Sequence, residues 1–142
     1  MHNIARGLKI LVAESDRAVL EMNQIRLDVA GFHTLTARTG HAAAQLLRNT
    51  RPNAMIIDLA LPDMRGLELI AVVRDVYGPS MPIILTGRGF SPEDIKTAVS
   101  LGVRDCVNKP FGGSEIIERV ARLLKKPGGP AAAGGAKAVV WV

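Results

Sequence analysis

The stretch "AMIIDLALPDMRGLEL", from Ala54 to Leu69, decides the fold of this chain. It opens with four apolar residues, stops on Asp58, and then passes through a connection that contains a proline and a glycine. A strand that is apolar throughout is typical of the centre of a parallel sheet covered on both faces. The amphipathic run after the connection predicts a crossover helix from about Leu67 to Tyr77. This stretch therefore indicates one strand-helix unit whose strand ends on an acid.

Short apolar runs alternate with longer helical patterns on both sides of this unit. The pattern predicts an α/β fold of five strand-helix units around a parallel sheet. The other predicted strands are Lys9–Ala13, Phe32–Ala37, Pro82–Thr86 and Arg104–Asn108. The other predicted helices cover residues 17–30, 39–49, 91–101 and 114–125. Because polar and apolar residues alternate in the second run, we expect it to be an edge strand.

The helix predicted over residues 17–30 has clear signals at both ends. Asp16 is a candidate N-cap, and Gly31 is a candidate stop. The apolar positions that we expect to form its packing face are Val19, Leu20, Ile25, Leu27 and Val29.

Length and composition predict one domain with short tails. The chain has 142 residues, of which 48% are hydrophobic and 4% aromatic, which suits a single aliphatic core. We assign residues 1–8 to an N-terminal lead-in, 9–126 to the folded domain, and 127–142 to a flexible tail rich in Gly, Pro and Ala. The apolar end of this tail, "AVVWV", contains Trp141. It has two interpretations, docking on a groove or neighbouring sheet edge and disorder, of which we favour disorder.

Charge and cysteine content limit the classes of partner and compartment. The net charge of +5 would suit nucleic acid, but the arginines, Arg38 and Arg74 among them, are scattered singly, which favours solvated surface charge. The single cysteine, Cys106, allows no intramolecular disulfide. No apolar run approaches the length of a membrane span, and the first residues lack the apolar core of a signal peptide. We therefore expect a cytoplasmic protein with neither a nucleic-acid nor a membrane partner.

Polar residues follow four of the predicted strands. They are Glu14 and Ser15 after the first, Asp58 after the third, Thr86 after the fourth and Lys109 after the fifth. In an open parallel sheet, ligands bind beyond the carboxyl ends of the strands, where these residues would meet. Each alone is more simply a turn residue or a solvated charge, but four at one edge favour a site. Their chemistry suits attack of Asp58 on a phosphoryl group, with a hard cation and Lys109 offsetting negative charge and Thr86 bonding a phosphoryl oxygen.

Two motifs carry a resemblance to a known family. "IIDLALPDMRGLEL" resembles the D-x-x-L-P-x-M-x-G segment of two-component response regulator receiver domains, and "NKPF" resembles their K-P-F. The resemblance covers about Lys9 to Leu124. It implies a flavodoxin-like (βα)5 three-layer sandwich whose parallel sheet has the strand order 2-1-3-4-5.

The resemblance also implies roles for individual residues. Asp58 matches the aspartate that a histidine kinase or histidine phosphotransfer protein phosphorylates in the presence of Mg²⁺. Thr86 matches the switch threonine, and Lys109 matches the lysine that contacts the phosphoryl group. Lys109 and Pro110 match a cis peptide bond, a form rare except before proline.

The metal ligands depart from the family pattern. Receivers have an acidic pair after the first strand, and the pair here is Glu14-Ser15. Asp58, the carbonyl of Ala60 and waters remain to hold Mg²⁺, with Glu14 acting through a water, so we expect a weakened site. Ser15 itself and Asp16 are the alternatives for a replacement ligand. Asp16 is also a candidate N-cap, and we favour that interpretation.

The switch residues depart from the family as well. Cys106 stands where receivers usually carry an aromatic residue that turns inward as the threonine moves. The segment "PIILTGRGF" loosely resembles a subgroup of single-domain regulators with T-G and then an aromatic, so Phe90 is either a substitute switch residue or a ring that covers the core. We interpret Cys106 as a small buried strand residue rather than a redox sensor.

Two hypotheses about function remain open. One is a phosphoacceptor that acts through protein contacts on the face from about Ser91 to Leu124, with a downstream partner or a second copy of the chain. The other is a receiver-fold interaction module that works without phosphorylation, motivated by Ser15 and Cys106. A turnover phosphatase would need a general acid two residues after Asp58, where the chain has Ala60. We therefore expect no enzyme beyond autocatalytic phosphotransfer to Asp58 and hydrolysis from it.

Overall fold

A computed structural model describes residues 7–125, which form five strands and five helices in alternation. The strands are β1 (Lys9–Ala13), β2 (His33–Ala37), β3 (Ala54–Asp58), β4 (Ile83–Gly87) and β5 (Asp105–Asn108). The helices are α1 (Arg17–Val29), α2 (Gly40–Asn49), α3 (Gly66–Tyr77), α4 (Pro92–Ser100) and α5 (Glu115–Lys125). All pairings in the sheet are parallel, and its order is β2-β1-β3-β4-β5. The predicted fold class and strand order are confirmed.

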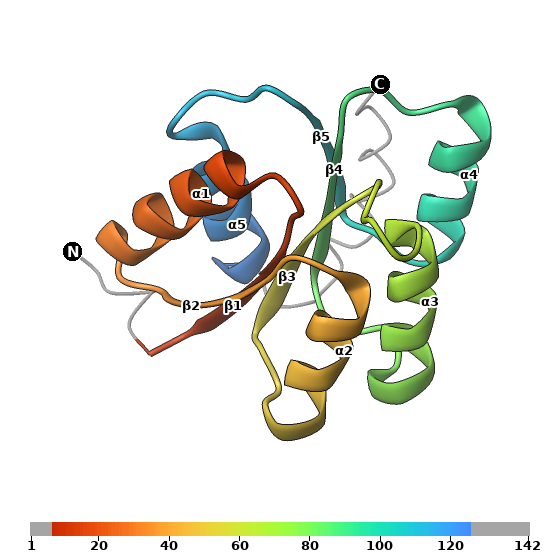
Figure 1. Cartoon of the computed structure of the whole chain (residues 1–142), viewed down its shortest axis with the longest axis horizontal. Helices are drawn as coiled ribbons and strands as arrows, with labels where there is room; N and C mark the ends of the chain where they lie inside the picture. The colour runs from red at the N-terminus through yellow and green to blue at the C-terminus, as the bar shows by residue number, and fades with distance from the viewer. Residues whose placement is uncertain (1–6, 126–142) are drawn as a thin grey trace.

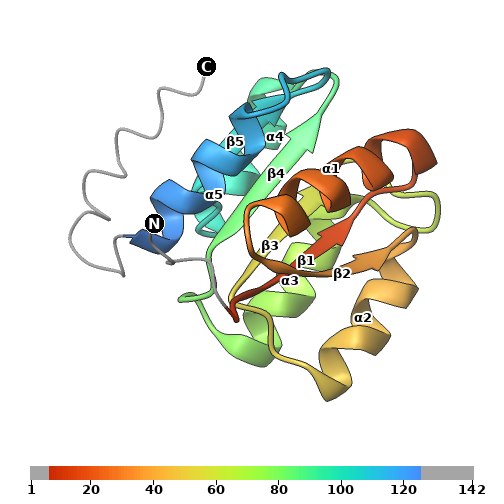
Figure 2. The ribbon, with the colours of Figure 1, turned by 90° about the vertical axis from the view of Figure 1, so that its left-hand side faces the viewer.

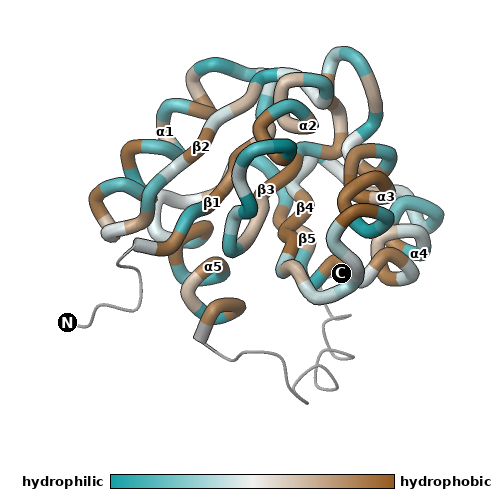
Figure 3. Tube along the Cα trace, turned by 90° about the horizontal axis from the view of Figure 1, so that it is seen from below, coloured by the Kyte–Doolittle hydropathy of each residue, from teal (hydrophilic) through white to brown (hydrophobic). Residues whose placement is uncertain are grey.

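Helices cover both faces of the sheet, so the molecule has three layers. Helices α1 and α5 lie on one face, and α2, α3 and α4 lie on the other (Figures 1 and 2). Along the central strands, successive residues join opposite cores because strand side chains alternate with a period of two. Met55 and Ile57 pack towards α2, α3 and α4, whereas Ile56 packs towards α1 and α5. Hydrophobic colour accordingly runs through the strands in the middle of the molecule (Figure 3).

The structure confirms the predicted N-cap of α1 and gives α4 a capped start as well. The side chain of Asp16 accepts hydrogen bonds from the backbone amides of Ala18 and Val19, at 2.9 and 3.2 Å. Ser91 forms a capping box with Asp94 at the start of α4. The peptide bond between Lys109 and Pro110, expected to be cis, is cis.

One predicted packing face was partly wrong. Ile25 and Val29 are 62% and 82% exposed, although both were expected to pack on the sheet. The buried stripe of α1 is Leu20, Asn23 and Leu27, and the helical period turns positions 25 and 29 away from it. The two residues instead line an apolar surface groove between α1 and the start of α5.

The interpretation of the arginines as solvated was wrong for Arg74. Its guanidinium lies partly buried at the amino edge of the sheet and donates to the backbone carbonyls that precede β4 and β5. Among the residues described, no helix combines the length and apolar character needed to cross a membrane. Residues 1–6 of the predicted lead-in lie outside the described residues, as do residue 126 and the predicted tail of residues 127–142 with Trp141.

Candidate functional site

The sequence-predicted polar residues meet at the carboxyl edge of the sheet. An open cavity of about 570 Å³ lies there. It is lined by Glu14, Ser15, Asp16, Asp58, Leu59, Ala60, Gly87, Arg88, Gly89 and Lys109. Thr86 is buried and in register with Asp58, but it is not among the described residues that line this cavity. Its backbone carbonyl accepts the amide of Leu59 at 2.8 Å, so β4 fixes the residue that follows the aspartate.

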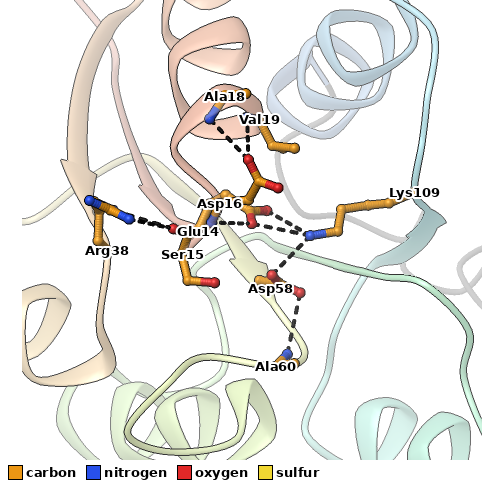
Figure 4. A network of polar contacts seen from close by, with 9 residues as sticks. All are labelled: Glu14, Ser15, Asp16, Ala18, Val19, Arg38, Asp58, Ala60 and Lys109. Carbon is orange, nitrogen blue, oxygen red and sulfur yellow. Dashed lines mark hydrogen bonds and ion pairs between the residues drawn. The ribbon is translucent and has the colours of Figure 1, made fainter.

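Lys109 joins the two buried carboxylates of the cavity. Its Nζ lies 2.9 Å from Oδ2 of Asp58, and 3.0 and 3.1 Å from the two carboxylate oxygens of Glu14 (Figure 4). The side chains of Lys109, Glu14 and Asp58 are only 6%, 3% and 6% exposed. The carboxyl ends of β1, β3 and β5 thus bring two acidic side chains and one basic side chain together.

The charges of this cluster do not balance. Burial raises the pKa of Glu14, and repulsion from Asp58 adds to this, against the bonds that Glu14 accepts from the Asp16 amide and from Lys109. Burial alone would lower the pKa of Lys109, but its hydrogen bonds to Asp58 and Glu14 outweigh burial and raise it. Lys109 is therefore protonated at neutral pH, and two carboxyl groups face this single ammonium group, so the formal charges of the three side chains sum to −1.

The connection after β3 places Asp58 through a close backbone crossing. The amide of Gly66 donates to the carbonyl of Leu59 at 2.7 Å, and Ala60 pairs with Arg65 as an isolated antiparallel bridge. A Cβ on Gly66 would lie 2.1 Å from the carbonyl oxygen of Asp58, so only glycine fits there. The amide of Ala60 donates to Oδ1 of Asp58 at 3.3 Å. The motif glycine thus allows the loop to fold back beside the carboxylate.

A second acid of the same connection, Asp63, was not predicted as a site residue. Its carboxylate accepts the amides of Gly40 and His41, at 2.8 and 2.9 Å, and Nδ1 of His41 lies 2.6 Å from Oδ2. The bond from the Gly40 amide is the largest of the influences that hold the pKa of Asp63 well below its usual value. Asp63 therefore ties the connection after β3 to the start of α2. Nothing in the sequence spacing pointed to that contact.

The donor set at the cavity suits a hard cation. Glu14 and Asp58 offer carboxylate oxygens, Ser15 a hydroxyl and Ala60 a backbone carbonyl, and Mg²⁺ prefers oxygen ligands. The carboxylate of Asp16 lies towards the first turn of α1, where it caps the helix (Figure 4). Within residues 7–125, no group of three or more His, Cys, Asp and Glu side chains is arranged around a common metal position. The excess negative charge and the oxygen donors nevertheless fit Mg²⁺.

Arg38 contributes a contact that the sequence did not predict. Its Nε and Nη2 donate to the backbone carbonyl of Ser15, at 3.3 and 3.0 Å (Figure 4). The side chain lies at the end of β2 and was interpreted only as surface charge. It fixes the backbone of the residue that replaces the second acid.

Cys106 and Phe90, the two residues considered beside the switch threonine Thr86, lie on the α2-α3-α4 side of the sheet. Cys106 is 7% exposed on β5, in register with Leu85, and burial raises its pKa to about 12. The thiol is therefore protonated at neutral pH, which fits a packing role. Phe90 packs against the same core, and its ring lies so close to β4 that a Cβ on Gly87 would meet it at 3.2 Å.

Comparison with known proteins identifies the family and the fold. A family model of the response regulator receiver domain matches residues 10–121. The solved receiver domain from Methanospirillum hungatei has a TM-score of 0.80 at 24% identity, covering 84% of this chain and 94% of that one. The receiver domain of a Francisella response regulator has a TM-score of 0.76 at 27% identity, covering 84% and 98%.

Curated relatives agree with the family match. Response regulator MprA of a Mycobacterium species is 33% identical over 120 residues, which is 84% of this chain and 51% of that protein. DNA-binding response regulator MtrA of Mycolicibacterium smegmatis is 34% identical over 124 residues, which is 87% of this chain and 54% of that protein. The chain spans about half the length of these relatives. By its family match, its fold and the residues gathered at the carboxyl edge of its sheet, the chain belongs to the receiver domains of two-component response regulators.

Proposed function

We propose that this receiver domain, residues 9–126, accepts a phosphoryl group on Asp58 from the phosphohistidine of a histidine kinase or phosphotransfer protein in the cytoplasm. The observation that carries the proposal is the ion pair of 2.9 Å between Asp58 and Lys109 inside an open cavity. A buried carboxylate that only ended a strand would still need a cation, but it would not need an opening to solvent. Both are required if an anionic group is to approach Asp58.

The chain's own residues supply most of the chemistry. A carboxylate oxygen of Asp58 forms the new P–O bond while the P–N bond to the donor imidazole breaks, and the imidazole leaves with the electron pair and takes up a proton. Lys109 then transfers one of its contacts from carboxylate to phosphoryl oxygen. Thr86, adjacent to Asp58 in the sheet, reaches the phosphoryl group if its side chain turns towards the cavity. Hydrolysis from Asp58 uses the same cavity, whose rim includes Arg88.

Bound Mg²⁺ would supply the positive charge that Lys109 alone does not. Asp58, the carbonyl of Ala60 and the carboxylate of Glu14 would hold it, with Ser15 contributing at most a hydroxyl. Because hydroxyls are weaker ligands for Mg²⁺ than carboxylates, the affinity is reduced in comparison with a site that has both acids. Asp16 takes no part in this set, since its carboxylate caps α1.

Output passes through protein contacts on the face formed by α4, β5 and α5, residues Ser91 to Leu124. Thr86 lies in β4 next to β5, and Phe90 connects β4 to α4, so movement of Thr86 reaches this face through Phe90 rather than through Cys106. The partner is a downstream protein or a second copy of the chain.

Phosphorylation is tested by intact mass spectrometry after incubation with acetyl phosphate and Mg²⁺. The wild type should gain the mass of one phosphoryl group, and removal of Mg²⁺ by chelation should slow the gain. Asp58→Asn is the matched control because it keeps the shape of the side chain and removes the nucleophile. Equal labelling of wild type and Asp58→Asn, or no labelling of either, contradicts the proposal.

The second candidate is an interaction module that works without phosphorylation. It is favoured by one observation, namely that Lys109 already forms ion pairs with both Glu14 and Asp58. If this function is the correct one, Asp58→Asn binds the downstream partner as tightly as the wild type does, whether or not acetyl phosphate is present.

A further inference from the structure

The residue before the motif glycine reaches from the phosphoacceptor loop to the output face. Arg65 pairs with Ala60 in the returning arm of the loop and is the N-cap residue of α3. Its backbone amide donates to Oε1 of Glu68 at 3.2 Å, which fixes the first turn of α3. From this fixed backbone, Nη2 donates to Oδ1 of Asp94 at 2.9 Å, in the first turn of α4. One side chain therefore connects the loop that follows Asp58 with α4.

Asp94 is fixed by hydrogen bonds within the first turn of α4. Its carboxylate is only 13% exposed, and Oδ2 accepts the amide of Ser91 at 3.1 Å. The amide of Asp94 in turn donates to the hydroxyl of Ser91 at 3.0 Å. Burial would raise the pKa of Asp94, but the bonds from Ser91 and Arg65 outweigh burial and lower it. The carboxylate that Arg65 contacts is thus an integral part of the cap of α4.

Packing between the two helices leaves room for movement. Arg65 and Asp94 border a surface cavity of about 480 Å³ between α3 and α4, which lie side by side (Figures 1 and 3). Helix α4 has one buried residue, Ala98, whereas α3 has five. A helix held by little apolar contact shifts at low cost, so a polar contact at its start has a large share in setting its position.

We propose that Arg65 is a positioning residue that couples the phosphoacceptor loop to α4 through Asp94. The proposal rests on the proposed function, since the coupling matters for signalling only if Asp58 is modified. It adds a connection on the α3 side of α4, apart from the one through Thr86 and Phe90. A rearrangement of the loop around Asp58 and Ala60 moves the guanidinium of Arg65, and the capped start of α4 follows.

The unmodified protein tests the coupling without any phosphoryl chemistry. The NMR chemical shifts of the backbone amides are compared in four forms of the full chain. These are the wild type, Arg65→Gln, Asp94→Asn and the double variant. Asparagine still accepts the Ser91 amide, so Asp94→Asn keeps the cap. We expect Asp94→Asn to shift the amides of Leu59 and Ala60, and the double variant to add little to either single change. Confinement of the Asp94→Asn shifts to α4, or full additivity in the double variant, overturns the proposal.

Addition of beryllofluoride with Mg²⁺ separates this proposal from the proposed function. In the wild type, amides in 59–65 and in 92–100 should both shift. Arg65→Gln should keep the first response and lose most of the second, and Arg65→Lys should restore part of it. Glu93→Gln, a neighbouring exposed acid of α4, should respond as the wild type does. A full α4 response in Arg65→Gln overturns the coupling, whereas a wild type without any response in 59–65 overturns the phosphoacceptor function and leaves the amide-shift result above to decide the coupling.

Discussion

Lys109 and Arg74 are partly buried cations at opposite edges of the same sheet, and their partners differ in kind. Lys109 lies at the carboxyl edge and contacts the carboxylates of Asp58 and Glu14 in an open cavity. Arg74 lies at the amino edge and donates to four backbone carbonyls. These carbonyls belong to Gly78, Met81, Leu101 and Gly102.

Under the proposed function, this difference separates a functional cation from a structural one. Carbonyls satisfy the hydrogen bonds of Arg74 without balancing its charge, and burial followed by repulsion from Arg104 lowers its pKa. Arg74 instead holds together two connecting segments, the one between α3 and β4 and the one between α4 and β5. Lys109 contacts two carboxylates in an open cavity, an arrangement that leaves a place for a further positive group such as a metal ion. Four substitutions test this contrast.

The largest effect is expected for Lys109→Met. Removing the ammonium takes away the cation that offsets charge on the transferring phosphoryl group, and loss of one such contact costs about 100-fold or more in rate. The rate of mass gain with acetyl phosphate and Mg²⁺ measures it. Arg74→Met is the control because it also removes a partly buried cation, and it should label at nearly the wild-type rate. Similar rates for the two variants contradict the contrast.

Arg74→Met should instead lose stability. Four carbonyls lose a charged donor, and hydrogen bonds to charged groups contribute about 1.5–3 kcal/mol each, so a total loss of about 3 kcal/mol remains after water replaces some of them. Urea unfolding followed by circular dichroism gives the free energy of unfolding. The exposed arginine in the last turn of α2, Arg48, provides the control. Arg48→Met should change the free energy of unfolding by less than about 0.5 kcal/mol.

Ser15→Asp should strengthen the metal site of the carboxyl edge. A carboxylate in place of a hydroxyl adds a charged oxygen ligand, and we expect the Mg²⁺ dissociation constant to fall about 10-fold or more. Titration of backbone amides with Mg²⁺ measures it. Asp16→Asn keeps the helix cap and should leave the affinity unchanged. A weaker site in Asp16→Asn would show that Asp16, and not Ser15, holds the replacement ligand.

The smallest effect concerns acid sensitivity at the loop after β3. The pKa of Asp63 is lowered by the Gly40 and His41 contacts, so the unfolded chain binds a proton more readily than the folded one. The stability that Asp63 contributes is present above its unfolded value of 3.8 and is lost as pH falls below it. Asp63→Asn should therefore lose less stability than the wild type between pH 5 and pH 3 in urea unfolding. Asp75→Asn, at an exposed position of α3, is the control.

The fold was largely readable from the sequence because its signals are local. Apolar runs of strand length, helix caps such as Asp16 and the motif around Asp58 each report on a few neighbouring residues, and the structure confirms the elements they predict. The packing face of α1 shows the limit of such local signals. The sequence marks Ile25 and Val29 as apolar, but it does not show that both face outward.

The parts of the site that the sequence did not reveal are contacts between distant polar side chains and backbone. Three arginines that look equivalent in the sequence make different contacts. Arg38 donates to the carbonyl of Ser15, Arg65 donates to the carboxylate of Asp94, and Arg74 donates to backbone carbonyls. Neither the charge of these arginines nor their spacing in the sequence predicts which contact each one makes. In each of the three contacts, the partner lies 23 or more residues away in the sequence. Asp63 was hidden for the same reason, since its partners belong to α2.

The central claim is that the cluster of Lys109, Glu14 and Asp58 is a working phosphoacceptor site despite Ser15. The most direct measurement is a titration of the wild type with beryllofluoride at fixed millimolar Mg²⁺, followed by the backbone amides of Ala60 and Lys109. We predict a saturable change in the chemical shifts of both amides that requires Mg²⁺ and that Asp58→Asn lacks. Amides that stay in place throughout the titration, or that shift equally in Asp58→Asn, would contradict it.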